Sequence, residues 1–296
     1  MPNLTDLAEI RALCAKYDFS LSKGFGQNFI INPGVCPRIA AAAGIDGGFG
    51  VLEIGPGIGV LTRELAARAA RVVAIELDER LLPLLAETLA DCPNVRIVPG
   101  DVLQLDLPAL LAQEFAGLRV AVCANLPYYI TSPIVMKLLN ERLAVENITV
   151  MVQKEAAERL TAAPGSRESG AVSYAVAYYA RPHLLFTVQP GSFYPAPTVT
   201  SAVIRLDVLP SPAVHTEDEA GFFALIRAAF GQRRKTTANA VANGLHLPRA
   251  QVEQALLAAG LDARVRPEKL TLADFAALQA QLAAQQGGAA AKAGPV

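Results

Sequence analysis

The chain has 296 residues, of which 52% are hydrophobic and 18% charged, and its formal net charge is -1. This composition is that of a globular protein, and the length leaves room for two domains. It contains no run near the roughly 18 apolar residues of a membrane-spanning helix, and an early acidic stretch without a long apolar region argues against a secretory signal. The four cysteines, Cys14, Cys36, Cys92 and Cys123, form no CxxC pair, which argues against a zinc site or disulfide framework and favours a reducing cytoplasm.

Short apolar strands alternate with helix-like stretches from about residue 50, which is typical of an α/β domain with a largely parallel sheet. Residues 1–48 before them are predicted to be a helical leader that ends in a loop. The predicted strands are Gly50–Ile54, Arg71–Ile75, Val95–Val98, Arg119–Ala124 and Asn147–Val152, followed by Leu184–Val188 and Ser201–Val208 as a closing pair.

The pattern becomes helical after residues 209–216, a linker with two prolines. Apolar side chains at Phe222, Leu225, Ile226, Ala229 and Phe230 have helical spacing. Thr271-x-x-Asp274 resembles a capping box that opens a last helix through Leu282. We therefore predict a first domain over residues 1–210, a small all-helical domain over 217–285 and a flexible tail over 286–296.

A glycine-rich loop, Gly55-Pro56-Gly57-Ile58-Gly59, follows the strand that ends at Ile54. Glycines at a strand-to-helix turn let the backbone approach a ligand closely. A dinucleotide loop of the form GxGxxG would need glycine at position 60, where this chain has Val60. On its own the loop is also compatible with an ordinary tight turn.

Two carboxylates follow the next two strands. Glu76 stands 21 residues after Gly55 at a strand end, where it can accept both hydroxyls of an adenosine ribose, and Asp101 is placed to meet the adenine amino group. Either residue alone could be a helix cap. Together with the glycines they suit S-adenosylmethionine, whose sulfonium carries no phosphate and needs no anion cradle.

The fourth strand runs into Asn125-Leu126-Pro127-Tyr128. Methylation of an exocyclic adenine amine requires its lone pair to be drawn out of the ring plane. The Asn125 side-chain oxygen and the Leu126 carbonyl, fixed by Pro127, could accept the two amino hydrogens, and Tyr128 could stack on the base. A base extruded from a hairpin needs a second aromatic wall, for which Phe193 is the candidate, although it could equally be a core residue.

These segments together resemble the ribosomal RNA adenine N6-dimethyltransferase family, in its bacterial small-subunit branch. The resemblance spans nearly the whole chain. The matching segments are GFGQNFI (24–30), LEIGPGIGVLT (52–62), VVAIELD (72–78), GDVL (100–103), NLPYYITSPI (125–134), MVQKEAAERL (151–160), FYPAPTVTSAVIRL (193–206) and FGQRRKT (230–236). One departure is Tyr129, where some members carry Asn.

The resemblance implies a class I, Rossmann-like methyltransferase domain with a mostly parallel seven-stranded sheet. It implies S-adenosylmethionine as methyl donor, with S-adenosylhomocysteine as product and no metal. The implied substrate is two adjacent adenosines in the 3′-terminal hairpin loop of 16S rRNA, each dimethylated within the immature small ribosomal subunit. The implied cofactor contacts are Asn28, Ile30, Gly55, Gly57, Glu76, Asp101 and Asn125.

The helical region carries a local positive charge. Residues 221–270 hold eight Lys or Arg against three Asp or Glu, a net charge of +5. Arg233, Arg234 and Lys235 cluster at its start and are candidates for phosphate contacts with RNA. A three-residue basic run can also be only a solvated helix face. The absence of a self-complementary apolar stripe favours a monomer.

Three other functions stay open. An Erm-type enzyme, which methylates large-subunit rRNA, shares the cofactor strands, although QRRKT and SAVIRL favour the small-subunit branch. A DNA adenine methyltransferase typically has a larger recognition domain than the roughly 80 residues after the linker. A non-catalytic ribosome assembly factor could use the same fold, but the intact Asn125–Tyr128 motif favours catalysis.

Overall fold

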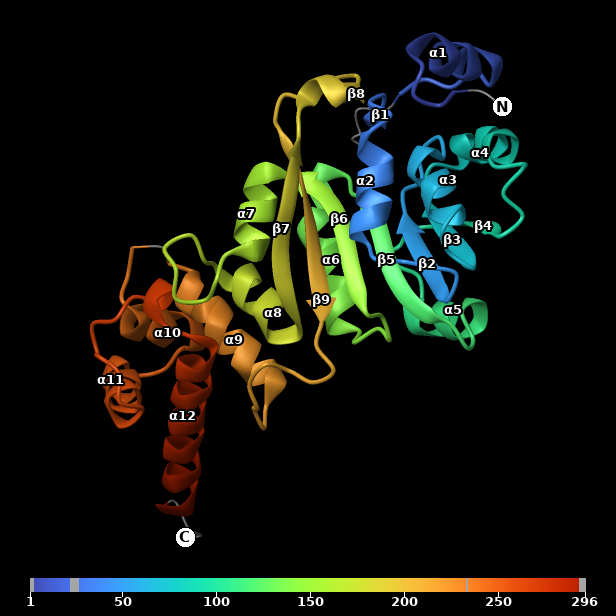
Figure 1. The fold of residues 1–296 in the computed structure, drawn as a ribbon. Coiled ribbons are helices and arrows are strands. Elements are labelled where there is room, and N and C mark those ends of the chain that lie inside the picture. The colour runs from blue at the N-terminus through green and yellow to red at the C-terminus, as the bar shows by residue number, and fades with distance from the viewer. Residues whose placement is uncertain (1–2, 22–26, 233, 293–296) are drawn as a thin grey trace. The chain divides into compact units, whose positions relative to one another are not determined.

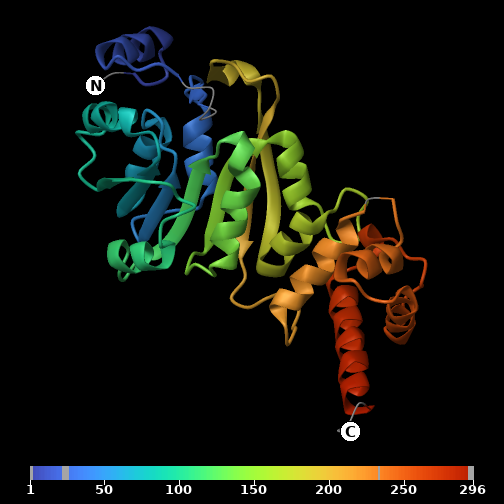
Figure 2. The same cartoon turned by 180° about the vertical axis from the view of Figure 1, so that it is seen from behind.

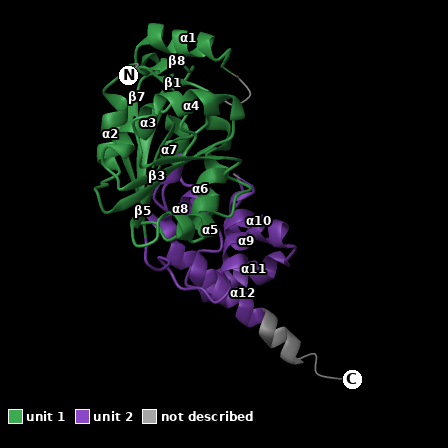
Figure 3. Cartoon of the chain, turned by 90° about the vertical axis from the view of Figure 1, so that its right-hand side faces the viewer, with its two compact units in different colours: residues 1–158, 181–208 green, residues 159–180, 209–296 purple. Residues whose placement is uncertain are grey.

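The computed structural model describes residues 3–21, 27–232 and 234–292. They form two compact units, the first within residues 1–158 and 181–208 and the second within residues 159–180 and 209–296 (Figure 3). Residues 159–180, which the sequence analysis placed in the first domain, thus group with the C-terminal helices. Whether either unit folds as an independent domain stays a prediction.

The first unit is built on a seven-stranded sheet in the order β4-β3-β2-β5-β6-β9-β7 (Figure 1). Strands β2 to β6 are parallel and β9 runs antiparallel to β6. The strands are β2 Phe49–Ile54, β3 Arg71–Glu76, β4 Val95–Pro99, β5 Arg119–Asn125, β6 Asn147–Gln153, β7 Ala180–Val188 and β9 Ser201–Val208. This confirms the mostly parallel seven-stranded sheet.

The predicted strands agree with the observed ones to within one residue, except at β7. This strand begins at Ala180, four residues before the predicted start at Leu184. The added residues include Arg181, Pro182 and His183, and β7 is the last strand of the sheet. An edge strand tolerates proline and polar side chains because one side of its backbone makes no ladder hydrogen bonds.

Helices cover both faces of this sheet. Helices α2 and α3 pack together on one face and α6 lies on the other (Figures 1 and 2). The helices of this part are α1 Leu7–Lys16, α2 Val35–Ala42, α3 Val60–Ala66, α4 Leu82–Thr88, α5 Leu107–Glu114, α6 Thr131–Asn140 and α7 Lys154–Thr161, with 3-10 turns at η2 Glu79–Leu81, η3 Tyr128–Ile130 and η4 Pro190–Ser192. All six residues of the central strand β2 are buried, as expected for a strand covered on both faces.

The N-terminal segment packs on the first unit. Leu4, Ile10 and Leu13 share a buried apolar cluster with residues of α4, and Lys16 donates a hydrogen bond to Glu87 at 2.6 Å. Further along the chain, β1 (Phe29–Ile30) pairs antiparallel with β8 (Phe193–Tyr194), so that Ile30 faces Phe193. This pairing was not predicted from the sequence, because strands of two residues are too short to show a periodic pattern.

The second unit is helical throughout its regular elements. These are α8 Ala171–Tyr179, α9 Glu219–Phe230, α10 Thr237–Leu245, α11 Arg249–Ala258, α12 Leu272–Lys292 and the 3-10 turn η5 Pro267–Lys269. The predicted apolar face of α9 is buried at Phe222, Leu225, Ile226 and Ala229. No helix within the described ranges has the length and apolar composition needed to cross a bilayer.

Helix α12 confirms one prediction and corrects another. The Thr271 amide donates to the Asp274 carboxylate at 2.7 Å and the Asp274 amide to the Thr271 hydroxyl at 3.1 Å, which is the predicted capping box. The helix, however, does not end at Leu282 but continues to Lys292, while the flexibility of the tail over residues 286–296 stays a prediction. Its alanines and glutamines are strong helix formers and outweigh the two glycines at 287 and 288.

Tyr174 on α8 is the polar centre of the second unit. Its ring is fully buried against Phe230 and Phe275, and its hydroxyl donates to the carbonyls of Pro267 and Leu270. This cluster explains why α8 groups with the C-terminal helices despite its place in the sequence.

We expect Tyr174→Phe to lower the free energy of unfolding by about 1–3 kcal/mol, because buried carbonyls lose their donor. The measurement is urea denaturation of full-length protein. Tyr129→Phe is the matched control, since the Tyr129 side chain is 56% exposed and should change nothing. Equal denaturation midpoints for Tyr174→Phe and the parent would contradict the role assigned to the hydroxyl.

Candidate functional site

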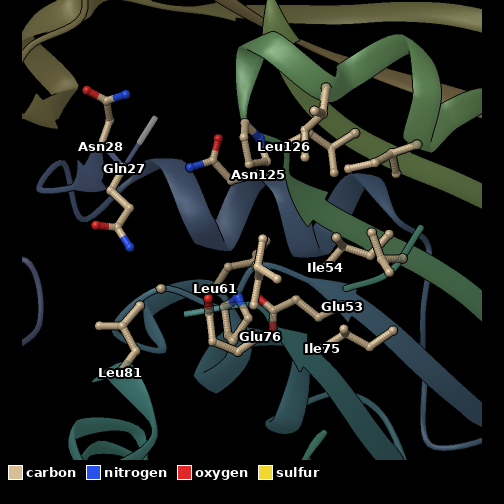
Figure 4. A pocket seen from close by; sticks show the side chains of 18 of the residues that line it. Gln27, Asn28, Glu53, Ile54, Leu61, Ile75, Glu76, Leu81, Asn125 and Leu126 are labelled. Atoms are coloured by element: carbon tan, nitrogen blue, oxygen red, sulfur yellow. The ribbon is translucent and has the colours of Figure 1, made fainter. Parts of the chain in front are cut away.

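A cavity opens at the carboxyl ends of the central parallel strands, with about 1090 Å³ of empty space including its mouth. Figure 4 shows the side chains around it, drawn from the leader and from β2, β3 and β5. The predicted cofactor and target residues all line it: Asn28, Ile30, Gly55, Gly57, Glu76, Asp101, Asn125, Leu126, Pro127, Tyr128 and Phe193.

The glycine loop shapes the floor of the cavity. Gly55 has φ 69° and Gly57 has φ 60°, in the left-handed region that favours glycine. A Cβ atom added at Gly55 would meet no protein atom within 4 Å. Gly55 also lines the cavity, so this open space faces the cavity. The loop therefore leaves room for a ligand to lie against its backbone at Gly55.

Glu76 ends β3 at the cavity and is only 6% exposed. Its Oε1 accepts a hydrogen bond from the Asp78 amide at 2.8 Å. Burial raises the pKa of Glu76 to about 6, while this amide and that of Gly57 oppose the shift. The adjacent 3-10 turn η2 is capped by Asp78, whose carboxylate accepts from Arg80 N, so the alternative role of helix cap belongs to Asp78 and not to Glu76.

Asp101 lines the same cavity one strand further along, and it is not a helix cap, because Asp106 caps the following helix α5. Its Oδ1 accepts a hydrogen bond from the Leu103 amide at 2.9 Å and so stabilises the turn after β4. The side chain is only partly buried and contributes to the cavity wall. Asp101 therefore both stabilises this turn and lines the cavity.

The cavity wall is acidic. It contains the carboxyl groups of Glu53, Glu76 and Asp101, and within the described residues it contains no lysine, arginine or histidine. Such a wall disfavours a phosphate-bearing dinucleotide and suits a ligand that carries positive charge and hydroxyl groups. Glu53 was not among the site residues predicted from the sequence. The feature that could have indicated its role is a carboxylate inside an otherwise apolar, buried strand.

Asn125 ends β5 on the other side of the cavity, and the chain then turns sharply. The Leu126 amide donates to the Met151 carbonyl at 3.0 Å, and the Pro127 carbonyl accepts from Ile130 N at 3.3 Å and from the Thr131 hydroxyl at 3.2 Å. The Tyr128 hydroxyl lies 2.6 Å from Ser201 Oγ, and burial raises the pKa of Tyr128. These bonds hold the turn from both ends, which fixes where Asn125 and the Leu126 carbonyl can lie.

Phe193 is both a core residue and a wall of the cavity. It is 3% exposed, belongs to the apolar cluster that includes Ile30 and Val203, and lines the cavity through β8. Packing in the core and lining the cavity, the two roles considered for Phe193 from the sequence, are thus compatible. The pairing of β8 with β1 is what brings Phe193 and the leader to the same site.

The basic candidates lie in the second unit. Arg234 and Lys235 are exposed in the turn between α9 and α10, and neither has an ion pair with an acidic side chain among the described residues. Arg233 lies outside the described residues. The described chain also contains no group of three or more His, Cys, Asp or Glu placed to hold a metal ion.

The sheet order, the glycine loop and the acidic cavity define a class I S-adenosylmethionine-dependent methyltransferase. Solved structures agree. The fold matches the 23S rRNA methyltransferase ErmE with a TM-score of 0.67 and 28% identity over 86% of this chain and 100% of that chain. It matches a dimethyladenosine transferase from Plasmodium falciparum with a TM-score of 0.73 and 27% identity over 87% and 98%.

The sequence profile described as ribosomal RNA adenine dimethylase matches residues 18–284, so the chain belongs to that family. The chain is 50% identical over 272 residues to "Ribosomal RNA small subunit methyltransferase A" of Geobacillus thermodenitrificans (strain NG80-2), covering 90% of this chain and 93% of the relative. It is 44% identical over 284 residues to the protein of the same name from Alkaliphilus oremlandii (strain OhILAs), covering 96% and 99%.

Proposed function

We propose that this enzyme dimethylates the N6 amino groups of two adjacent adenosines in the 3′-terminal hairpin loop of 16S rRNA, acting on the immature small ribosomal subunit in the cytoplasm as a monomer. The observation that carries the proposal is that every residue predicted to contact the methyl donor or the adenine lines one cavity. The chain is 44–50% identical to relatives named as small-subunit methyltransferases and 28% identical to the 23S rRNA methyltransferase ErmE. This difference supports small-subunit rRNA as the substrate rather than 23S rRNA.

The residues of the cavity fit S-adenosylmethionine. Glu76 would accept the ribose hydroxyls, Asp101 would meet the adenine amino group, and the backbone at Gly55 and Gly57 leaves room for the ligand. Asn28 and Ile30 would contact it from the leader. When bound, the cofactor supplies an electrophilic methyl group on its sulfonium.

The target amine would be oriented from the β5 side. Its two hydrogens would be donated to the Asn125 Oδ1 and to the Leu126 carbonyl, which draws the nitrogen lone pair out of the ring plane. Tyr128 would stack on the base, a contact worth roughly 1–3 kcal/mol, with Phe193 as the second wall. The nitrogen becomes acidic once alkylated, so its proton can leave to solvent without a dedicated base.

The direct test is to incubate the protein with labelled S-adenosylmethionine and either immature small subunits or large subunits, and to map dimethyladenosine. We expect label in two adjacent adenosines near the 3′ end of the small-subunit RNA. Label in large-subunit RNA would instead support the Erm-type alternative. Absence of label from both RNAs would support a non-catalytic assembly factor.

We further expect Arg234 and Lys235, together with Arg233, to contact RNA phosphates. Replacing Arg234 and Lys235 with Gln should weaken RNA binding and reduce the slope of log affinity against log salt by about 1 to 2. The matched control is Arg249→Gln, because Arg249 is already paired with Glu253 at 2.8 Å. Fluorescence anisotropy over a salt series measures the slope, and a slope equal to that of the parent would rule out the phosphate contacts.

A further inference from the structure

Ser201, the first residue of β9, is a fully buried side chain that contacts one aromatic wall of the cavity from behind. Its Oγ lies 2.6 Å from the Tyr128 hydroxyl, which is its one side-chain hydrogen-bond partner among the described residues. Tyr128 lines the cavity and Ser201 does not. A buried hydroxyl without a partner is costly, so this hydrogen bond is expected to stay formed.

Both ends of this hydrogen bond are fixed to the same strand. Ser201 pairs with Gln153 in the antiparallel ladder between β9 and β6. The turn that carries Tyr128 is bonded to β6 through the Leu126 amide and the Met151 carbonyl. Because β6 lies between β5 and β9 in the sheet, the Tyr128 side chain reaches across the end of β6 to a partner whose backbone is held in place.

The hydrogen bond to Ser201 holds the outer end of the Tyr128 ring. A tyrosine that is held only at its Cβ atom can move between side-chain rotamers, whereas a bond at its hydroxyl favours one direction of the ring axis. The segment from Phe193 to Ser201 therefore supplies one aromatic wall of the proposed target site and the anchor of the other.

The two methylations of one adenosine do not present the same amine. Before the first transfer, N6 carries two hydrogens, which the proposed geometry directs to the Asn125 Oδ1 and the Leu126 carbonyl. After it, N6 carries one hydrogen and one methyl group, so one of these two orienting hydrogen bonds is lost. The orientation of the base in the second transfer therefore depends more on the aromatic rings that stack on it.

We propose that Ser201 is a positioning residue that holds the Tyr128 ring for the second methylation of each adenosine. This inference rests on the proposed function for N6 dimethylation and for the contact of Tyr128 with the base. In each transfer the N6–C bond forms as the S–C bond of the methyl donor breaks, and one N6 proton leaves to solvent. Ser201 acts only through the ring, so its loss changes the relative rates of the two transfers.

The test is a time course of methyl transfer to unmethylated small subunits, with monomethyladenosine and dimethyladenosine quantified by mass spectrometry of the digested RNA. We expect Ser201→Ala to slow the second transfer by about tenfold and the first by about threefold or less, so that monomethyladenosine accumulates. Tyr128→Phe keeps the ring without its hydroxyl and should give the same accumulation. The double variant should add little, because both substitutions remove one hydrogen bond.

Ser173→Ala is the matched control. Ser173 is also fully buried, and its hydroxyl donates to the Arg159 carbonyl at 2.6 Å in place of an aromatic side chain. This variant loses a buried hydrogen bond of the same kind away from the cavity wall. The ratio of its two transfer rates should equal that of the parent, which separates positioning from a general loss of stability.

Equal slowing of both transfers by Ser201→Ala, or no slowing of either, would overturn the inference and leave the proposed function intact. A parent that forms no dimethyladenosine would overturn both. If Ser201→Ala does not fold, Tyr128→Phe decides, since a parent-like ratio of the two rates in that variant contradicts the inference.

Discussion

Asn125→Ala is expected to slow methyl transfer by about 100- to 1000-fold, the effect typical of removing one positioned hydrogen-bonding group from a reacting centre. Asn125 lies at the end of β5 with its neighbouring turn held by bonds from Met151, Ile130 and Thr131. The alanine variant keeps that turn and loses only the amide oxygen. Binding of S-adenosylhomocysteine should be mostly retained, because the remaining contacts with the methyl donor are unchanged.

Single-turnover transfer to small-subunit RNA, with calorimetry of cofactor binding alongside, separates these two effects. Asn140→Ala is the matched control, since Asn140 is exposed at the end of α6 and should leave both quantities unchanged. Transfer by Asn125→Ala at the parent rate would remove this side chain from the mechanism.

Glu76→Ala is expected to weaken cofactor binding by about 100-fold or more. Hydrogen bonds to a charged group contribute about 1.5–3 kcal/mol each, and two ribose hydroxyls would lose their acceptor. Transfer at saturating cofactor should recover in part, because the alanine variant leaves the Asn125 side of the cavity unchanged. The dissociation constant from calorimetry and the dependence of rate on cofactor concentration measure the two effects.

Glu79→Ala provides the comparison for this variant. Glu79 is an exposed carboxylate three residues along the same segment, and its removal should not change cofactor affinity. Equal dissociation constants for Glu76→Ala and Glu79→Ala would contradict the ribose contact. Thermal unfolding of both variants checks that the cavity wall remains folded.

The sequence was sufficient to predict the central sheet and most of the cavity because both depend on local patterns. Uninterrupted apolar runs marked the strands, and chemistry-bearing residues stood directly after them. In a parallel sheet those strand ends meet at one edge, so Gly55, Glu76, Asp101 and Asn125 converge without any knowledge of distant contacts. The role of each residue in binding or transfer stays a prediction.

The features that were not predicted depend on contacts between distant segments. The pairing of β1 with β8 links residues more than 160 positions apart through two-residue strands. Helix α8 groups with the C-terminal helices because Tyr174 packs on Phe230 and Phe275, which nothing in its own segment indicates. Glu53 was missed for another reason: one carboxylate in an apolar strand does not reveal whether it lies in the core or at a cavity.

The central claim is that one cavity holds a methyl donor over the ends of β2, β3 and β4 and an adenine amine at Asn125. The most direct measurement is a crystal structure of the protein with S-adenosylhomocysteine and adenosine monophosphate bound. The account predicts ribose hydroxyls at Glu76, and the adenine N6 within hydrogen-bond distance of Asn125 Oδ1 and the Leu126 carbonyl. An Asn125 side chain turned away from the adenine, or the ribose bound elsewhere than at Glu76, would contradict it.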